Sequence, residues 1–368
     1  MVNHIQKSDN GGDAELPLPT RPDGVTREWL EAALRLRHPG LALASAAIVD
    51  VLPGTSTKIR VRVRAGDDGG DLPATLIVKG GFEDHSAAMG PMYFNEMRFY
   101  RDVQPYVPMP SPRCFYSGTD PASHQSIVIM EDLVLRGVRF CDPLQPQSPA
   151  QVARRLSTMA AYHARTWNSP DFERGGRFDW IGGRHEGWSV TYQEHYLEPE
   201  RWAHYMALPR GTAVSRLLRD RDWMRRALTM LGEHHRRSPQ CLCHGDTHLG
   251  NLYEEPDGTP GFFDAQVARG PWQLDVTYHL VGALDIADRR AHERDLLRHY
   301  LGELAAHGVT PPSFDEAWEA HRREVAYGLF IFLINETRFQ TEAVNTAYTA
   351  RFGAAALDYG THELLARA

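Results

Sequence analysis

The sequence predicts an α+β protein of two lobes: a small N-terminal lobe with an antiparallel sheet plus a helix, and a larger, mostly helical C-terminal lobe. Short apolar segments separated by turn residues fill the first part of the chain. From Ser148 onward, apolar residues recur instead at helical spacing. The 368 residues, 42% hydrophobic and 24% charged, are enough to form two lobes and a sizeable core.

Composition and charge exclude several classes of protein. A net charge of −7 argues against a nucleic-acid partner. No apolar run approaches the roughly 18 residues that a membrane span needs, and the N-terminus lacks a signal pattern. Four cysteines in a chain this long do not form a disulfide framework, so a cytoplasmic location is expected.

Residues 1–22 are expected to form a disordered leader, and residues 23–132 an N-terminal lobe. A helix is predicted over residues 26–37, with Thr26 as its cap. A second helical stretch begins at Pro91. Five strands are predicted from apolar runs and alternation, at residues 46–52, 59–63, 74–79, 113–117 and 126–130.

The lysines stand out because arginine supplies nearly all other cations; the chain has only Lys7, Lys58 and Lys79. Lys79 ends an apolar strand, where a point-charge cation suits the phosphates of a nucleotide. Lys58 follows a Gly-Thr-Ser-Thr turn; it could reach a phosphate or be a solvated surface lysine.

The C-terminal lobe is expected to span residues 133–368. Ser148 and Pro149 predict the start of one helix, and Ser313 with Glu316 forms a capping box for another. Further helices are expected within residues 168–238, after residue 268, and over residues 288–307 and 314–339.

One stretch, residues 241–266, carries the expected chemistry. It comprises an apolar run, a polar loop, a turn and a second apolar run. Two strands joined by a turn would bring Asp246 and Asn251 from the loop close to Asp264 at the end of the second run. Their oxygen atoms suit a hard cation such as Mg²⁺ beside a phosphate.

A zinc site is the alternative for the same stretch, because Cys241, Cys243, His244 and His248 lie close in sequence. Structural zinc usually needs two separated ligand pairs, and the sequence offers no second pair. We therefore interpret the cysteines as buried strand residues, and His244 as a structural residue that bonds the loop backbone.

The segment HGDTHLGNL, followed by FFDAQVARGPWQLDVTYHL, resembles the small-molecule kinases. These are the aminoglycoside phosphotransferases and the related ecdysteroid-kinase-like, choline-kinase-type group, which have a protein-kinase-like fold. The resemblance covers residues 50–285. It implies that Asp246 is the catalytic base and that Asn251 and Asp264 hold Mg²⁺ beside ATP, or possibly GTP.

The resemblance also assigns nucleotide-binding residues in the first lobe. Lys79 would form an ion pair with Glu96 and bind the phosphates, which the turn residues Gly54, Thr55, Ser56 and Thr57 would cover. The hinge between the lobes would bond the adenine edge through the backbone of Met130, Glu131 and Leu133. Asp275 would support the catalytic loop.

Residues 168–238 are expected to form a helical insert that shapes the acceptor pocket. Interspersed carboxylates would suit a polycationic aminoglycoside, whereas the aromatic residues would suit a planar or sugar-like ligand. Both sets could equally serve packing and solvation. The aromatic residues are Trp180, Trp188, Tyr192, Tyr196, Trp202, Tyr205 and Trp223; the carboxylates are Asp171, Glu173, Asp179, Glu186, Glu194, Glu198 and Glu200. Polar residues 335–338 interrupt an apolar helix face, which is therefore expected near the cleft.

The predicted function is Mg²⁺-dependent transfer of the γ-phosphate of ATP or GTP to a hydroxyl group of a small molecule, by a monomer or homodimer. One alternative is an aminoglycoside-resistance kinase, although FFDAQ is closer to the ecdysteroid-kinase-like group. Another is a pseudokinase-like module that binds nucleotide without turnover. A protein kinase is disfavoured because no Ala-Pro-Glu segment follows Asp264.

Overall fold

The computed structural model describes residues 16–66, 72–120 and 122–366. The N-terminal lobe contains the antiparallel sheet that the sequence predicts, in the order β1-β2-β3-β5-β4. Its strands are β1 (Leu43–Leu52), β2 (Thr57–Ala65), β3 (Thr75–Gly80), β4 (Cys114–Asp120) and β5 (Gln125–Glu131). Along β2 the apolar side chains are buried and alternate with arginines, which explains why this segment forms a strand.

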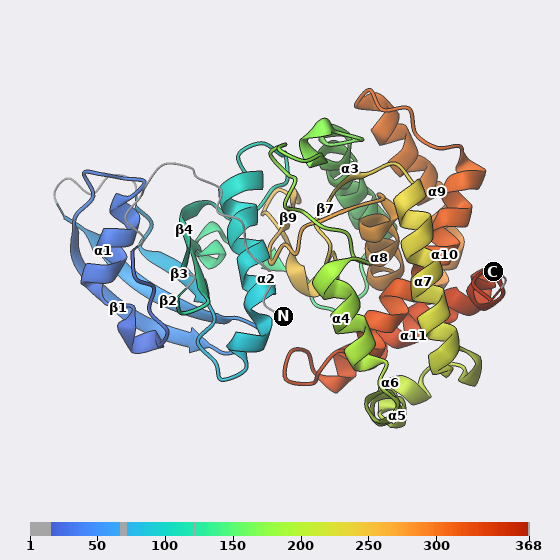
Figure 1. Ribbon diagram of the computed structural model, residues 1–368. Helices are drawn as coiled ribbons and strands as arrows, with labels where there is room; N and C mark the ends of the chain where they lie inside the picture. Colours follow the sequence, from blue (N-terminus) through green and yellow to red (C-terminus); the bar gives the residue numbers. More distant parts are fainter. Residues whose placement is uncertain (1–15, 67–71, 121, 367–368) are drawn as a thin grey trace.

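Two helices flank this sheet. Helix α1 (Arg27–Arg35) begins at Thr26, whose side chain accepts a hydrogen bond from the backbone N–H of Trp29, and buries its apolar stripe on the sheet. Helix α2 (Ser86–Arg98) continues as a π-helical turn, Phe99–Val103. Figure 1 shows α2 between the sheet and the helical lobe. Helix α2 can therefore present side chains to the boundary between the two lobes.

The predicted leader lies partly outside the described residues, which begin at residue 16. Residues 16–22 pack against the N-terminal lobe instead of forming a free leader. Leu18 is buried in the core under the sheet. The carbonyl of Pro17 accepts a hydrogen bond from the Trp29 indole, and that of Pro19 accepts one from Gln125. Burial of apolar surface and these two bonds hold the segment in place.

The C-terminal lobe is mostly helical, as predicted, and its helices surround one large apolar core (Figure 1). They are α3 (Pro149–Arg165), α4 (Gly187–Tyr196), α5 (Pro199–Ala207), α6 (Pro209–Thr212), α7 (Arg221–Arg237), α8 (Gln273–Ala283), α9 (Ile286–Ala306), α10 (Phe314–Ile334), α11 (Glu342–Tyr359) and α12 (Thr361–Leu364). The predicted capping box of Ser313 with Glu316 is present, and the predicted cap Ser148 also forms a capping box, with Gln151. Within the described residues, no helix has the length and apolar character needed for a membrane span.

The helix predicted over residues 314–339 ends earlier, at Ile334. Asn335 is extended, and the buried guanidinium group of Arg210 donates hydrogen bonds to the carbonyl groups of Phe332 and Asn335. Because these carbonyls are satisfied by a side chain, the helix needs no further turn. Residues 335–341 are then free to reach the cleft.

Small strands support the loops of the C-terminal lobe. Strand β7 (Cys241–Cys243) pairs with β10 (Ala268–Gly270), and β8 (Leu252–Glu254) pairs with β9 (Pro260–Phe262) and with β6 (Arg139–Phe140). The β8–β9 pair is the predicted hairpin. The backbone N–H of Phe263 donates to the carbonyl of Asn251, which brings the two ends of the hairpin together.

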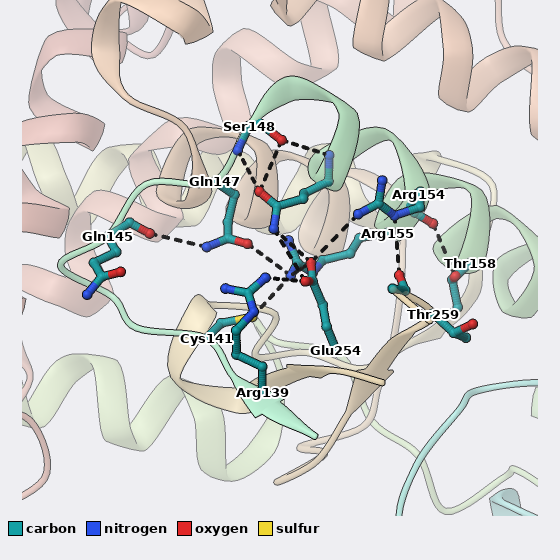
Figure 2. Close-up of polar contacts among 12 residues, drawn as sticks. Arg139, Cys141, Gln145, Gln147, Ser148, Arg154, Arg155, Thr158, Glu254 and Thr259 are labelled. Carbon is teal, nitrogen blue, oxygen red and sulfur yellow. Dashed lines mark hydrogen bonds and ion pairs between the residues drawn. The ribbon is translucent and has the colours of Figure 1, made fainter. Parts of the chain in front are cut away.

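A buried ionic cluster fixes β8 to α3. Figure 2 shows Glu254 surrounded by Arg139, Arg154 and Arg155. Arg155, which is fully buried, donates to Glu254 Oε1 over 2.8 Å, and Gln151 donates to the same carboxylate over 3.1 Å. Charge-assisted hydrogen bonds of this kind hold geometry well. Strand β8, which begins one residue after Asn251, is thus tied to helix α3.

Candidate active site

The loop between β7 and β8 is held by Asp275, from the first turn of α8. The fully buried Asp275 carboxylate accepts hydrogen bonds from the backbone N–H groups of His244, at 2.7 Å, and Gly245, at 2.8 Å. The Thr247 hydroxyl donates to the carbonyl of Asp275 over 2.8 Å. These bonds fix the loop backbone just before and after Asp246, the supporting role that the sequence led us to expect of Asp275.

His244 also supports the loop. Its side chain is buried, and Nε2 lies 3.0 Å from the carbonyl oxygen of Phe263, while Nδ1 accepts from the backbone N–H of Asp246. Burial lowers the pKa of His244, so the ring stays neutral and can donate at one nitrogen and accept at the other. His244 therefore joins the Asp246 loop to the end of β9.

Arg184, which precedes α4, connects the two functional loops and was not predicted. It donates to the carbonyl of Gly245 over 2.9 Å and to the carbonyl of Gln266. Gly245 has φ +82°, and a Cβ there would lie 2.1 Å from Arg184 and from the Gln266 carbonyl. Only glycine fits this position. No local motif around Arg184 indicates its role.

Asp246 and Asn251 form one hydrogen-bonded unit. The side-chain amide of Asn251 donates to Asp246 Oδ2 over 2.9 Å and to the Asp246 carbonyl over 3.0 Å. His248 Nε2 lies 3.5 Å from the same carboxylate oxygen. Burial alone would raise the pKa of Asp246, but its interactions with His248, His244 and Arg184 outweigh burial and lower it. The carboxylate is therefore ionised at neutral pH.

Asp264 follows β9 and faces two ammonium groups from the other lobe. Its Oδ1 lies 2.5 Å from Lys79 Nζ, and its Oδ2 lies 3.5 Å from Lys58 Nζ. Burial alone would raise the pKa of Asp264, but the two lysines outweigh burial and lower it. Asp264 has φ +56°, a conformation that aspartate tolerates better than most residues. The sequence left open whether Lys58 is a solvated surface residue or could reach a phosphate. In the structure, Lys58 lines the cleft.

Lys79 is the central cation of this arrangement. It is 4% exposed, and Nζ lies 2.6 Å from the Glu96 carboxylate on α2. Burial alone would lower the pKa of Lys79, but Asp264 and Glu96 together raise it, so the side chain stays charged. The Lys79–Glu96 contact that the family resemblance implied is present in the structure.

Four residues of the turn between β1 and β2 were predicted to cover the phosphates, but only three of them line the cleft. Gly54, Thr55 and Ser56 line the cleft. Thr57 is fully buried instead, and its hydroxyl donates to Glu83 over 2.9 Å. Its side chain therefore supports the turn from behind.

The predicted hinge residues lie at the end of the sheet, outside the lining of the main cleft. Met130 pairs with both β3 and β4, and the backbone N–H of Glu131 donates to the carbonyl of Arg113. Leu133 is buried at the start of a short 3₁₀ helix, Leu133–Arg136. Strand pairing already occupies backbone groups of Met130 and Glu131. Few of their N–H and C=O groups are therefore left to hydrogen-bond the adenine or guanine ring of a nucleotide.

A cleft of about 550 Å³ opens between the lobes. The charged residues that line it are Lys58, Lys79, Glu96, Arg184, Asp246 and Asp264. Its far side, beyond Asp246, is aromatic. Of the aromatic residues singled out within 168–238, Trp188 and Tyr192 line it; Trp202 and Trp223 are core residues. The remaining aromatic walls come from residues that the sequence did not single out, namely Tyr278, Tyr327, Phe332 and Phe339.

The geometry does not favour the zinc alternative. His163, not His244 or His248, lies beside Cys241 and Cys243, with the ligating atoms within 4.8 Å of one another. Both ring nitrogens of His163 are already engaged, Nδ1 with the Tyr300 hydroxyl at 2.9 Å and Nε2 with Asp275 at 3.2 Å. His163 therefore has no free nitrogen for a metal.

Asp264 and Asn251, which both line the cleft, offer donors that suit Mg²⁺. Asp264 offers a carboxylate kept ionised by its neighbours, and Asn251 uses its amide nitrogen on Asp246, which leaves its carbonyl oxygen available. Hard oxygen donors of this kind match Mg²⁺. The phosphates of a nucleotide would supply further oxygen ligands.

The class of protein that these features indicate is a phosphotransferase. The features are the two lobes, the buried lysine between two carboxylates, and the fixed Asp246 in the same cleft. A family model described as the phosphotransferase enzyme family, APH, matches residues 54–312. The chain belongs to this family, and the family predicted from the sequence is confirmed. No curated protein sequence matches the chain.

Solved structures share the fold at low sequence identity. The complex of APH(2")-IIIa with GDP and kanamycin is 11% identical, with a TM-score of 0.50, over 82% of this chain and 88% of that one. A choline/ethanolamine kinase family protein from Mesorhizobium loti is 16% identical, with a TM-score of 0.47, over 92% of this chain and 98% of that one. A macrolide 2'-phosphotransferase from Brachybacterium faecium is 15% identical, with a TM-score of 0.43, over 88% and 97%. The first of these likenesses, together with the family, confirms the predicted bilobal, protein-kinase-like fold.

Proposed function

We propose that the protein transfers the γ-phosphate of ATP or GTP to a hydroxyl group of a small molecule, with Asp246 as the base. The observation that carries this proposal is the placement of Lys79. It lies buried between Glu96 and Asp264, at the wall of a cleft that Asp246 also lines. A charged lysine held this way is poised to bind phosphate oxygens.

In the proposed reaction, the hydroxyl oxygen of the acceptor attacks the γ-phosphorus. Its proton passes to the Asp246 carboxylate, and the bond between the γ-phosphorus and the β–γ bridging oxygen breaks. The nucleoside diphosphate leaves with that oxygen, and Asp246 then releases its proton to solvent. The lowered pKa of Asp246 keeps it ready to accept a proton, and its hydrogen bonds from Asn251 hold it in position.

Asn251 and Asp264 are the residues that would hold Mg²⁺, which when bound offsets the negative charge of the phosphates. Lys79 and Lys58 would bind phosphate oxygens from the other side of the cleft, and Gly54, Thr55 and Ser56 would cover them. Phosphoryl transfer depends mainly on positioning and electrostatics, which this set of residues can supply. Since none of these groups is missing, a pseudokinase-like module without turnover is the weaker alternative.

Replacement of Asp246 by asparagine tests the proposal. The Asp246→Asn variant keeps the shape of the side chain but loses the base, so turnover should fall by about 100- to 10,000-fold. Product is measured by mass spectrometry, and nucleotide affinity by calorimetry. Nucleotide affinity should stay close to that of the unaltered protein.

The control is Asp257→Asn, the same chemical change in the exposed β8–β9 turn. It should leave turnover unchanged. Turnover of the Asp246→Asn variant at a rate near that of the control would refute the assignment of the base.

A further inference from the structure

The acceptor side of the cleft has almost no free negative charge. Among the described residues, the carboxylates that line the cleft are Glu96, Asp246 and Asp264. Glu96 and Asp264 are each paired with Lys79, and Asp246 accepts from Asn251. Three cations also line the cleft, namely Lys58, Lys79 and Arg184. Three cations and three carboxylates balance, so the lining has no net negative charge to attract a polycationic ligand, although Asp246 is paired only with a neutral amide. Such a ligand would also meet the guanidinium group of Arg184.

The carboxylates of residues 168–238, which could have suited a polycation, do not line the cleft. Several of these carboxylates have partners outside the cleft. For example, Glu194 pairs with Arg225, and Glu186 accepts a hydrogen bond from the backbone N–H of Gly183. Two of the three aromatic residues of α4, Trp188 and Tyr192, do line the cleft, whereas Tyr196 does not. Trp188 lies against Tyr192, with ring centroids 5.1 Å apart, yet remains 39% exposed. A large aromatic face is left partly uncovered at this point.

A second part of the cleft lining is a fixed aromatic stack. Tyr278 stacks on Phe332 at 5.4 Å between centroids, and Phe332 stacks on Tyr348 at 3.9 Å. Phe339, from the segment after α10, lies 5.7 Å from His85 of the other lobe. Rigid aromatic walls favour a flat or ring-bearing ligand, because stacking adds to the free energy of apolar burial.

Among the described residues that line the cleft, three buried polar atoms have no hydrogen-bond partner within 3.5 Å. They are the hydroxyl of Tyr278, which lies near Asp246, one oxygen of the Gln340 side-chain amide, and Nε of Arg184, whose guanidinium group already donates to backbone carbonyls. Tyr278 is 4% exposed, and the Gln340 amide nitrogen lies 3.1 Å from His248 Nε2, beside Asp246. Buried polar groups are costly unless they are hydrogen-bonded. A hydroxyl both donates and accepts, so a ligand hydroxyl satisfies Tyr278 and also satisfies the Gln340 amide in either orientation.

From these observations we infer that the acceptor is an uncharged, ring-bearing alcohol with at least two hydroxyl groups. One hydroxyl lies at Asp246 and another bonds Tyr278 or Gln340, while the ring lies between Trp188 and the Tyr278–Phe332 wall. This inference rests on the proposed function, since it identifies the class of molecule that is phosphorylated. It excludes aminoglycosides and quaternary ammonium alcohols as preferred acceptors.

Calorimetric titration of the full chain, with and without ADP and Mg²⁺, tests the inference. The probes are two neutral aryl glucosides, salicin and arbutin, against kanamycin and choline. At least one glucoside should bind about tenfold more tightly than either cation. The inference is overturned if kanamycin or choline binds more tightly, or if neither glucoside binds.

Matched variants locate the binding site. Trp188→Ala and Tyr192→Leu should each weaken glucoside binding about tenfold, since each removes an aromatic wall. Val190→Ala, an exposed position on the same helix outside the cleft lining, should not change it. Unchanged glucoside binding in both aromatic variants would overturn the inference.

Asp246→Asn separates this inference from the proposed function. Acceptor binding in that variant should persist, because the pocket walls are intact. If the variant turns over normally, the assignment of the base fails, whereas the glucoside titrations still decide the acceptor class.

Discussion

Lys79 carries the charge balance of the site, because a single ammonium group neutralises carboxylates from both lobes. Lys79→Met would leave Glu96 buried without a cation. Breaking a buried pair in this way typically costs about 3–5 kcal/mol, so the variant should unfold at lower denaturant concentration. Nucleotide affinity should also fall, by about tenfold or more. Both effects can be measured by denaturant titration and calorimetry.

The double variant Lys79→Met/Glu96→Gln distinguishes the two roles of the lysine. Removing the unpaired carboxylate should restore part of the lost stability. Nucleotide affinity should stay low, because the cation is still absent. Recovery of nucleotide affinity in the double variant would contradict a direct role of Lys79 in binding phosphate.

His163, which contacts Asp275 beneath the Asp246 loop, should make the stability of the protein depend on pH. Burial alone would lower the pKa of His163, but the hydrogen bond to Asp275 and contact with Cys243 raise it from 6.5 to about 9. Because the pKa is higher in the folded state, the stabilisation is fully present below pH 6.5 and is lost as the pH rises through about 9. A shift of this size corresponds to a free energy of unfolding on the order of 3 kcal/mol.

Denaturant midpoints measured from pH 6 to pH 9.5 check this prediction, with His163→Gln as the control that cannot titrate. The unaltered protein should lose stability across the range, while the variant should show a flatter profile. Parallel profiles for the two proteins would show that His163 is not the titrating group.

At the scale of elements, the Asp246 loop and the β8–β9 turn depend on glycines in different ways. Gly245 and Gly258 both have positive φ, +82° and +85°. A Cβ at Gly245 would collide with Arg184 and the Gln266 carbonyl, whereas at Gly258 the nearest atom is 3.8 Å away. Gly258→Ala should therefore cost only the backbone strain, roughly 1–2 kcal/mol.

Gly245→Ala should cost more, about 3 kcal/mol or above, and should abolish turnover because the Asp246 loop must shift. Thermal denaturation and product assays on the two variants provide the comparison. Equal losses of stability in the two variants would mean that the contacts of Arg184 do not constrain this loop.

Sequence patterns predicted the elements whose signals are local. The β8–β9 hairpin and its flanking loops lie within residues 241–266, so short-range spacing alone brought Asp246, Asn251 and Asp264 together. Arg184 and Gln340 could not be found in this way. Each reaches the site from a connecting segment whose path depends on how distant helices pack. Similarly, the end of α10 depends on Arg210, far away in sequence, and the inward side chain of Thr57 depends on Glu83.

At the scale of the whole molecule, the site is divided between lobes, so its ligands should stabilise the two lobes jointly. ATP with Mg²⁺ should raise the melting temperature by roughly 5 °C or more, and by more than ATP alone. Asn251→Ala should remove the Mg²⁺-dependent part of this rise and keep the rest. An unchanged Mg²⁺ effect in that variant, measured by differential scanning fluorimetry, would rule out Asn251 as a ligand.

The contact of Asp264 with Lys58 and Lys79 has a thermodynamic consequence. Without ligands, the carboxylate and the two ammonium groups act as counter-ions for each other. A divalent ion that takes over Asp264 frees both lysines for phosphate oxygens, and a nucleotide that draws the lysines away exposes Asp264 to the metal. Metal and nucleotide must then increase each other's affinity by the same factor, as reciprocal linkage requires. With the proposed roles of Asp264 and the two lysines, this exchange of partners at one carboxylate would make the enzyme prefer the metal–nucleotide complex to either component alone.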